Sequence, residues 1–129
     1  MFTIEEIKAA HAKVKSGADF PNYVKELIQL GVKEYATLVA DGNTEFKGND
    51  NYKVSSGAKY AALPVAKTSN AVQFKRDLLM HQQGGTDFPT FCSDCAKSGI
   101  HKWVVDFSKR TCTYFDQAGT EILTEQISA

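Results

Sequence analysis

Three cysteines and three histidines are the residues of this sequence whose types and spacing could support chemistry. Cys92 and Cys95 form a C-x-x-C pair, and residues three apart on a helix share one face, so both thiols could hold one metal ion or exchange a disulfide. With Cys112 and either His81 or His101, they supply three thiolates and an imidazole, a ligand set that suits zinc. A zinc- or thiol-dependent enzyme centred on the C-x-x-C pair is therefore one interpretation.

The spacing of these residues argues against both kinds of chemistry. A structural zinc site usually has two tight ligand pairs, and the second pair is missing here. A redox C-x-x-C pair works best at a helix N-terminus, but Cys92 follows the predicted cap Asp87 by several residues. No G-x-S-x-G, H-E-x-x-H, P-loop or Rossmann glycine pattern occurs. We predict no catalytic residue, metal ligand or cofactor; Cys92, Cys95, Cys112 and His101 are the alternative metal site.

The composition is that of a neutral globular protein. The chain has 129 residues, and its 15 Lys and Arg balance 15 Asp and Glu. With 43% apolar residues, this length fits a single domain, residues 1–129, rather than a disordered chain. A neutral chain lacks the basic field that binds phosphate backbones, so general nucleic-acid binding is disfavoured.

Neither a membrane span nor a secretory signal is evident in the sequence. The longest uncharged, apolar run covers residues 60–66, whereas a membrane-spanning helix needs about 20 apolar residues. Two acidic residues among the first six do not fit a secretory signal. An odd number of cysteines does not suit a disulfide-stapled exported domain. We therefore predict a cytoplasmic protein that does not insert into membranes.

The two halves of the sequence align with each other without a gap when Met1 is placed on Ser69. In this repeat alignment Asp19-Phe20-Pro21 falls on Asp87-Phe88-Pro89, and Gly31 falls on Gly99. Further matched pairs are Gly17 with Gly85, Tyr23 with Phe91, Tyr35 with Trp103, and Phe46 with Tyr114. The identities are few, but they fall where backbone geometry restricts the residue type. We predict an internal duplication. The alternative is that two unrelated helix-to-strand connections have similar residues because both must cap a helix in the same way.

Both halves predict the same order of elements, two helices and then three strands. Apolar residues at helical spacing, with polar caps and terminal glycines such as Gly17, give helices at residues 3–15, 20–30, 70–83 and 88–97. Strand-favouring segments between turns lie at residues 32–40, 44–47, 52–55, 101–107, 111–115 and 121–127.

The domain organisation follows from the size of the two units. Units at residues 1–56 and 69–129 are joined by a linker, residues 57–68, that is apolar enough to be ordered. Each unit, with about 60 residues, is too small to build its own core, so the two are expected to share one. We predict an α+β fold in which an antiparallel sheet packs against the helices.

The repeat gives the C-x-x-C cysteines a structural role. Cys92 aligns with Val24 and Cys95 with Leu27, both on the apolar stripe of a predicted helix. Because free cysteine behaves as a small hydrophobe, we expect both to pack in the core. Most aromatic residues are expected to be buried too, namely Tyr23, Tyr35, Phe46, Tyr52, Phe91, Trp103, Phe107, Tyr114 and Phe115.

Several segments resemble a known group of proteins. They are His81–Gly84, Thr86–Phe88, Phe91–Gly99, Lys102–Asp106 and the opening segment Met1–Phe20, which includes the run Lys13–Phe20. With these segments the chain resembles, over essentially its whole length, the YbcV-like family of small uncharacterised bacterial proteins. Some members are encoded in prophage regions and carry the label "phage envelope protein". The resemblance implies no catalytic residues, and the label implies an exterior role that the sequence does not support.

Two functions from different classes are consistent with the sequence. The first is a non-enzymatic accessory or binding protein, possible as a homodimer, that holds an unknown small ligand or protein partner in a crevice between its two units. Ligand sites favour such junctions. The second is the zinc- or thiol-dependent enzyme. The sequence favours the first.

Overall fold

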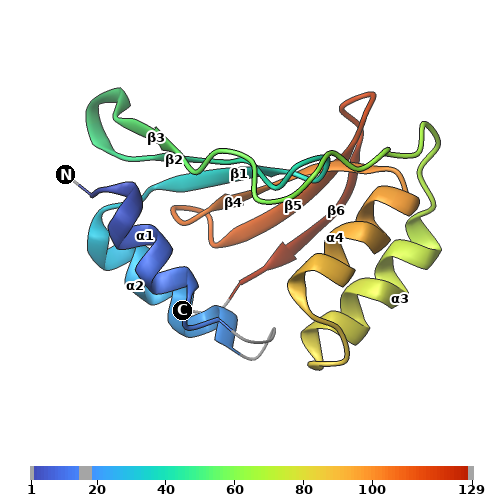
Figure 1. The fold of residues 1–129 in the computed structure, drawn as a ribbon, viewed down its shortest axis with the longest axis horizontal. Helices are drawn as coiled ribbons and strands as arrows, with labels where there is room; N and C mark the ends of the chain where they lie inside the picture. Colours follow the sequence, from blue (N-terminus) through green and yellow to red (C-terminus); the bar gives the residue numbers. More distant parts are fainter. Residues whose placement is uncertain (1, 15–18, 128–129) are drawn as a thin grey trace.

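The computed structural model describes residues 2–14 and 19–127, in which four α-helices lie on one face of a six-stranded antiparallel sheet (Figure 1). The first set of elements is α1 (Ile4–His11), α2 (Phe20–Leu30), β1 (Glu34–Leu38), β2 (Thr44–Lys47) and β3 (Lys53–Ser55). The second set is α3 (Ala71–Gln82), α4 (Phe88–Lys97), β4 (Ile100–Asp106), β5 (Thr111–Asp116) and β6 (Glu121–Gln126). The predicted α+β class is confirmed.

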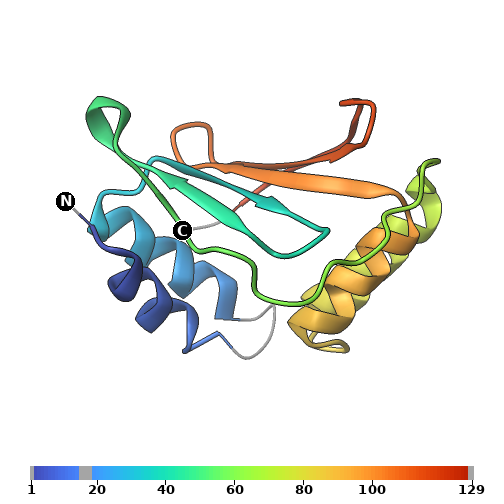
Figure 2. The same cartoon turned by 45° about the horizontal axis from the view of Figure 1, so that its top comes forward.

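The sheet has the strand order β3-β2-β1-β4-β5-β6, so β1 and β4 meet at its centre. Their antiparallel register places Ala36 opposite Val104, and these two residues are also equivalent in the repeat alignment. On the covered face, α1 and α2 form one helix pair and α3 and α4 form the other, at opposite ends of the molecule (Figures 1 and 2). The order of elements thus repeats, while descent from a duplicated unit stays a prediction.

Local chemistry explains where the helices begin. The Thr3 hydroxyl accepts a hydrogen bond from the backbone N–H of Glu6, and the Glu6 carboxylate accepts one from the backbone N–H of Thr3, which completes a capping box at the start of α1. At the start of α4, the Asp87 carboxylate accepts a hydrogen bond of 2.9 Å from Thr90 N–H. Both α2 and α4 carry a proline in their first turn, as the sequence predicts.

Two predicted elements are too long. The first helix ends at His11 rather than at Lys15, because the N–H groups of Lys13 and Val14 turn back to carbonyls three residues earlier. Lys15 and the predicted stop, Gly17, lie outside the described residues. Strand β1 is shorter than residues 32–40 because the N–H of Val32 still closes the end of α2, on the carbonyl of Leu27.

The core lies between the sheet and the helices. The residues of the central strands alternate, so that Tyr35, Trp103 and Val105 face the helices and are buried. Cys92 and Cys95 on α4 are completely buried beside them. Phe115 is only half-buried, and the Nζ of Lys102 lies 5.5 Å from its ring centroid. In the described ranges, no helix is both long and apolar enough to span a bilayer.

The linker, residues 57–68, lies against both halves of the molecule, and Figure 2 shows it running from β3 toward α3. The N–H of Leu63 donates to the carbonyl of Ala40 at 2.7 Å, and the N–H of Ala66 donates to the carbonyl of Ala96 at 2.9 Å. A Cβ placed on Gly99, in the turn after α4, would lie 2.6 Å from the carbonyl oxygen of Thr68. The glycine therefore permits the close approach of the linker.

Replacing the two aligned glycines tests this contact. Gly31 and Gly99 both have positive φ angles of 101° and 79°, but a Cβ on Gly31 would meet only the Phe2 ring, at 3.9 Å. Gly31→Ala is expected to lower the free energy of unfolding by about 1 kcal/mol, the cost of the left-handed backbone alone. Gly99→Ala is expected to cost about 3 kcal/mol, because the methyl group also displaces the linker backbone. Urea unfolding measures both, and equal losses would contradict the tight contact.

Candidate functional site

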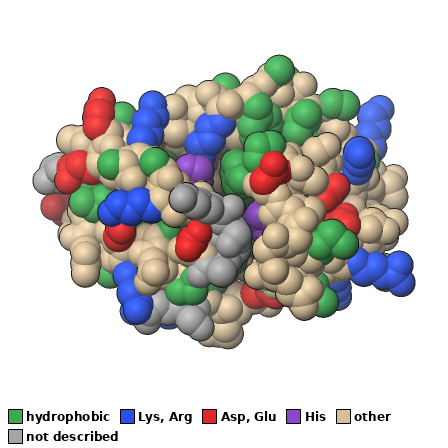
Figure 3. Space-filling model, turned by 60° about the horizontal axis from the view of Figure 1, so that its bottom comes forward, with side chains coloured by type: hydrophobic (Ala, Val, Ile, Leu, Met, Phe, Trp, Pro, Cys, Tyr) green, Lys and Arg blue, Asp and Glu red, His purple; other side chains and the backbone are tan. Residues whose placement is uncertain are grey.

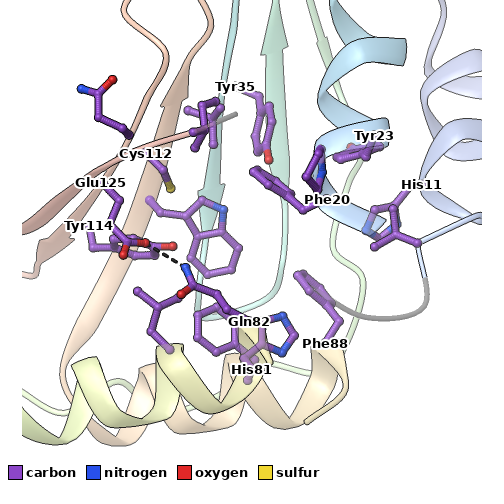
Figure 4. A pocket seen from close by; sticks show the side chains of 18 residues that line it. His11, Phe20, Tyr23, Tyr35, His81, Gln82, Phe88, Cys112, Tyr114 and Glu125 are labelled. Carbon is purple, nitrogen blue, oxygen red and sulfur yellow. Dashed lines mark hydrogen bonds between the residues drawn. The ribbon is translucent and has the colours of Figure 1, made fainter. Parts of the chain in front are cut away.

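A cavity of about 250 Å³ lies between the two helix pairs, against the centre of the sheet (Figure 4). Figure 3 shows this side of the molecule, with histidine and hydrophobic side chains gathered along the boundary between two lobes. The lining residues come from both helix pairs and from four strands: His11, Val14, Phe20, Pro21, Tyr23, Tyr35, Leu78, His81, Gln82, Phe88, Phe91, Trp103, Val105, Cys112, Tyr114, Glu125, Gln126 and Ile127. The cavity therefore exists only where the two halves meet.

Seven of the 18 lining side chains are those of Phe, Tyr or Trp. Three aligned pairs line it, and the members of each pair come from opposite halves of the chain: Phe20 with Phe88, Tyr23 with Phe91, and Tyr35 with Trp103. These pairs are the matched positions of the sequence repeat, so the repeated pattern builds both sides of one cavity.

Trp103 is the centre of the aromatic wall. Its ring centroid lies 5.8 Å from that of Phe91, 6.1 Å from that of Tyr114 and 6.3 Å from that of Phe88. Such tilted and edge-on contacts hold rings in fixed orientations, because the positive edge of one ring meets the negative face of another. The wall is therefore rigid and apolar.

Two histidines line the cavity from opposite helix pairs, His11 on α1 and His81 on α3. The Nδ1–H of His81 donates to the carbonyl of Thr86 at 3.0 Å, and its ring stacks on Phe91 at 4.3 Å between centroids. Burial lowers the pKa of His81 below the usual value of 6.5, against smaller opposing effects of Thr86 and of Asp87 and Asp94. Burial, and then the charge of Lys59, likewise lowers the pKa of His11. Both rings are thereby held neutral near pH 7.

A polar pair closes one side of the cavity. The amide nitrogen Nε2 of Gln82, at the end of α3, donates a hydrogen bond of 2.9 Å to Oε1 of Glu125 on β6 (Figure 4). Glu125 is half-buried and faces the aromatic wall, since its strand position lies opposite Cys112. The two residues are 43 positions apart, and the fold alone brings them together.

The residues of the alternative metal site do not form one ligand cluster among the residues that the structure describes. Cys92 and Cys95 face the core from α4, Cys112 lines the cavity from β5, and His101 is a half-buried residue of β4 outside the cavity lining. Within residues 2–14 and 19–127, no three His, Cys, Asp or Glu side chains are grouped as metal ligands. Burial raises the pKa of all three thiols, that of Cys112 to about 12. Such thiols are weak nucleophiles because the thiolate is the reactive form.

Several residues of this site were not singled out from the sequence. The sequence predicts a crevice between the units, but it gives no signal for Gln82 or Glu125, and it indicates His81 only as a possible zinc ligand. The aromatic residues are expected in the core, where Tyr35, Trp103 and Tyr114 are indeed buried, yet these three also line the cavity. The usable signal was the set of matched aromatic pairs in the repeat alignment.

Comparison with known proteins places the chain in a family. The family described as "Protein of unknown function (DUF1398)" matches residues 8–126. The chain belongs to this family. This member of DUF1398 is also similar to an uncharacterised protein, YcgX of Escherichia coli (strain K12), with 24% identity over 115 residues that cover 89% of this chain and 86% of the relative. The expected membership of a small uncharacterised family is confirmed, while the narrower YbcV-like and phage envelope names are not what these comparisons give.

The buried thiols of this DUF1398 protein are expected to be unreactive in the folded state. With a pKa of about 12, the fraction of Cys112 present as thiolate at pH 8 is about one in ten thousand. A disulfide reagent such as dithionitrobenzoate should therefore release almost no thionitrobenzoate from native protein, and three equivalents after denaturation. Rapid release of one or more equivalents at native conditions would show that a thiol is activated.

The two cavity histidines are expected to make stability depend on pH. Their pKa is lowered by folding, so between pH 6.5 and the lower folded value the unfolded chain binds more protons, and stability falls as the pH falls. The melting temperature should therefore drop between pH 7.5 and 5.5, and less so in His81→Gln. An unchanged drop in both His81→Gln and His11→Gln would contradict this origin.

Proposed function

We propose that this protein is a non-enzymatic binding protein that holds a small, flat and largely apolar ligand in the cavity between its two helix pairs. The observation that carries the proposal is the aromatic lining of that cavity, in which Trp103 contacts three other rings. Ligand sites are typically concave and apolar, with a few polar groups that fix orientation. The Gln82–Glu125 pair and the two histidines would be those groups.

The size of the cavity limits the ligand. An apolar cavity of roughly 150 Å³ accommodates benzene in a well-studied case. A cavity of about 250 Å³ therefore fits a single ring with a short arm, or a fused pair of rings. A flat ring can stack on the aromatic side chains of the cavity. These side chains are already held in place by one another, so they lose little conformational entropy when the ligand binds.

The state of the titratable groups supports binding rather than catalysis. Burial raises the pKa of Tyr23, Tyr35 and Tyr114, so the hydroxyls facing the cavity stay protonated. Burial raises the pKa of the Cys112 thiol, and the negative charge of Glu125 on the neighbouring strand raises it further, against a smaller lowering effect of the Tyr114 hydroxyl. An activated nucleophile needs a lowered pKa, and the pKa of this thiol is shifted the other way.

We also infer that the cavity arose from a duplicated ααβββ unit. In support, the elements of both halves agree in position in the repeat alignment, and both members of three matched aromatic pairs line the cavity. A cytoplasmic location is part of the same proposal. The three unpaired cysteines support it, because thiols persist in reducing compartments. The YbcV-like name remains a proposal based on resemblance alone.

Ligand binding can be followed with the protein's own fluorescence. Trp103 is the single tryptophan and lines the cavity, so its emission should change when the cavity fills. Single-ring and fused-ring aromatic fragments are expected to alter this emission saturably and to raise the melting temperature, because they bind only the folded state. Fragments that change neither quantity would contradict the proposal.

A cavity-filling variant distinguishes this site from the surface. Val14 is half-buried at the cavity, so Val14→Phe should occupy part of the volume and weaken fragment binding about tenfold or more, with little change in unfolding by urea. Val72, which is 64% exposed on α3, gives the matched control, and Val72→Phe should leave binding unchanged. Equal affinities in both variants would place the fragments elsewhere.

A further inference from the structure

We propose that the natural ligand of this cavity carries a positively charged nitrogen, an ammonium group on or beside a ring, which lies between the aromatic wall and the Glu125 carboxylate. This inference rests on the proposed binding function and specifies the chemical class of the ligand. It follows from the charges of the lining residues, the geometry of Glu125 and the electron-rich faces of the rings.

The charge of the described lining residues has one sign, which is negative. Among the described lining residues, Glu125 is the single Asp, Glu, Lys or Arg. The two histidines are neutral near pH 7, since burial lowers the pKa of each. The described lining itself therefore carries one negative charge, at Glu125, which attracts a cation and repels an anion, while the charge of Lys59 acts from behind the lining at His11 and Phe88.

The Glu125 carboxylate is fixed by a hydrogen bond, but no ion pair found among the described residues includes it. Its Oε1 accepts a hydrogen bond from the amide of Gln82, which carries no charge. The ion pairs found within the described residues join Lys13 with Glu26 and Lys47 with Glu45, and neither includes Glu125. The carboxylate is thus oriented by a neutral donor toward the ring of Tyr114 and half-shielded from water, so its charge is available to a ligand.

The rings beside Glu125 favour the same kind of ligand. The faces of Trp103, Tyr114 and Phe91 carry negative electrostatic potential, and Trp is the strongest aromatic partner for a cation. The centroid of Trp103 lies 5.8 Å from that of Phe91 and 6.1 Å from that of Tyr114, so one small cationic group in the cavity can approach more than one ring. Carboxylate and aromatic faces together are the combination that recognises organic ammonium groups.

Among the residues that the structure describes, the other positive groups near the cavity do not form a competing anion site. Helix α4 begins at the cavity with Phe88, but the Asp87 carboxylate already caps its N-terminus by accepting from Thr90 N–H. Lys59 lies 5.6 Å from the centroid of Phe88, and its Nζ donates to the Thr44 hydroxyl at 3.2 Å. Lys59 is not a lining residue, so an anionic ligand would not contact it directly.

The repeat alignment shows that a polar pair equivalent to Gln82 and Glu125 is missing on the other side of the cavity. In the repeat alignment, Gln82 corresponds to Val14 and Glu125 to Gly57. Val14 lines the cavity as Gln82 does, whereas Gly57 does not. A ligand would therefore place its charged end at the α3–β6 side and its apolar ring toward the α1–α2 side.

Three probes of nearly equal size test the charge preference: phenethylammonium, 2-phenylethanol and phenylacetate. At pH 7.5 and low salt, calorimetry and Trp103 emission should show that phenethylammonium binds about tenfold more tightly than 2-phenylethanol, and phenylacetate least tightly. Glu125→Gln should reduce the affinity for phenethylammonium about tenfold, to about that of 2-phenylethanol, and should change the affinity for the alcohol much less. Glu121→Gln, at an exposed position of the same strand, should change neither.

The outcomes separate the two proposals. If 2-phenylethanol and phenylacetate bind as tightly as the cation, the cavity binds ligands but the inferred charge is wrong. If Glu125→Gln retains the preference for phenethylammonium, or Glu121→Gln loses it, the cation does not lie beside Glu125. If none of the three probes binds, both the charge inference and the binding function are overturned.

Discussion

The pairing of β1 with β4 is the contact on which the rest of the structure depends. Each half contributes two helices and three strands, and this single antiparallel pairing joins them into one sheet. It fixes Tyr35 opposite Val105 and Thr37 opposite Trp103, and the inward side chains of the two strands form the floor of the cavity. Because the helix pairs are attached to opposite halves of the sheet, their separation follows from this register. A slip by one residue would put Tyr35 and Trp103 on opposite faces of the sheet.

The same geometry explains why the cavity is apolar and yet not filled. The helix pairs pack mainly within themselves and on their own strands, so the space between them is filled only by side chains that reach across. Those side chains are large rings that hold each other through tilted contacts, which limits how far they can collapse inward. Water inside such a wall finds few hydrogen-bond partners, and its release favours an apolar ligand.

Much of the fold could be predicted from the sequence because its signals are local. The caps at Thr3 and Asp87, the Phe-Pro helix starts and the alternation in β4 each depend on neighbouring residues. The adjacency of β1 and β4 could not be predicted this way, since their facing residues, Ala36 and Val104, belong to opposite halves of the chain. Periodicity shows which face of a strand turns inward, but not whether the opposite layer covers it completely. For that reason Trp103 was expected in the core rather than on a cavity wall.

The differences between the two halves would give the proposed binding site its specificity. A perfectly repeated unit would build a cavity with equal ends, which would offer a ligand no preferred orientation. Here β6 continues to Gln126 and carries Glu125, whereas its counterpart β3 ends at Ser55, before the position equivalent to Glu125. Likewise α3 ends in the polar Gln82, while the equivalent position after α1 is Val14. The residues that match in the repeat alignment thus supply an apolar lining on both sides of the cavity, and the residues that do not match place one charge at one end of it.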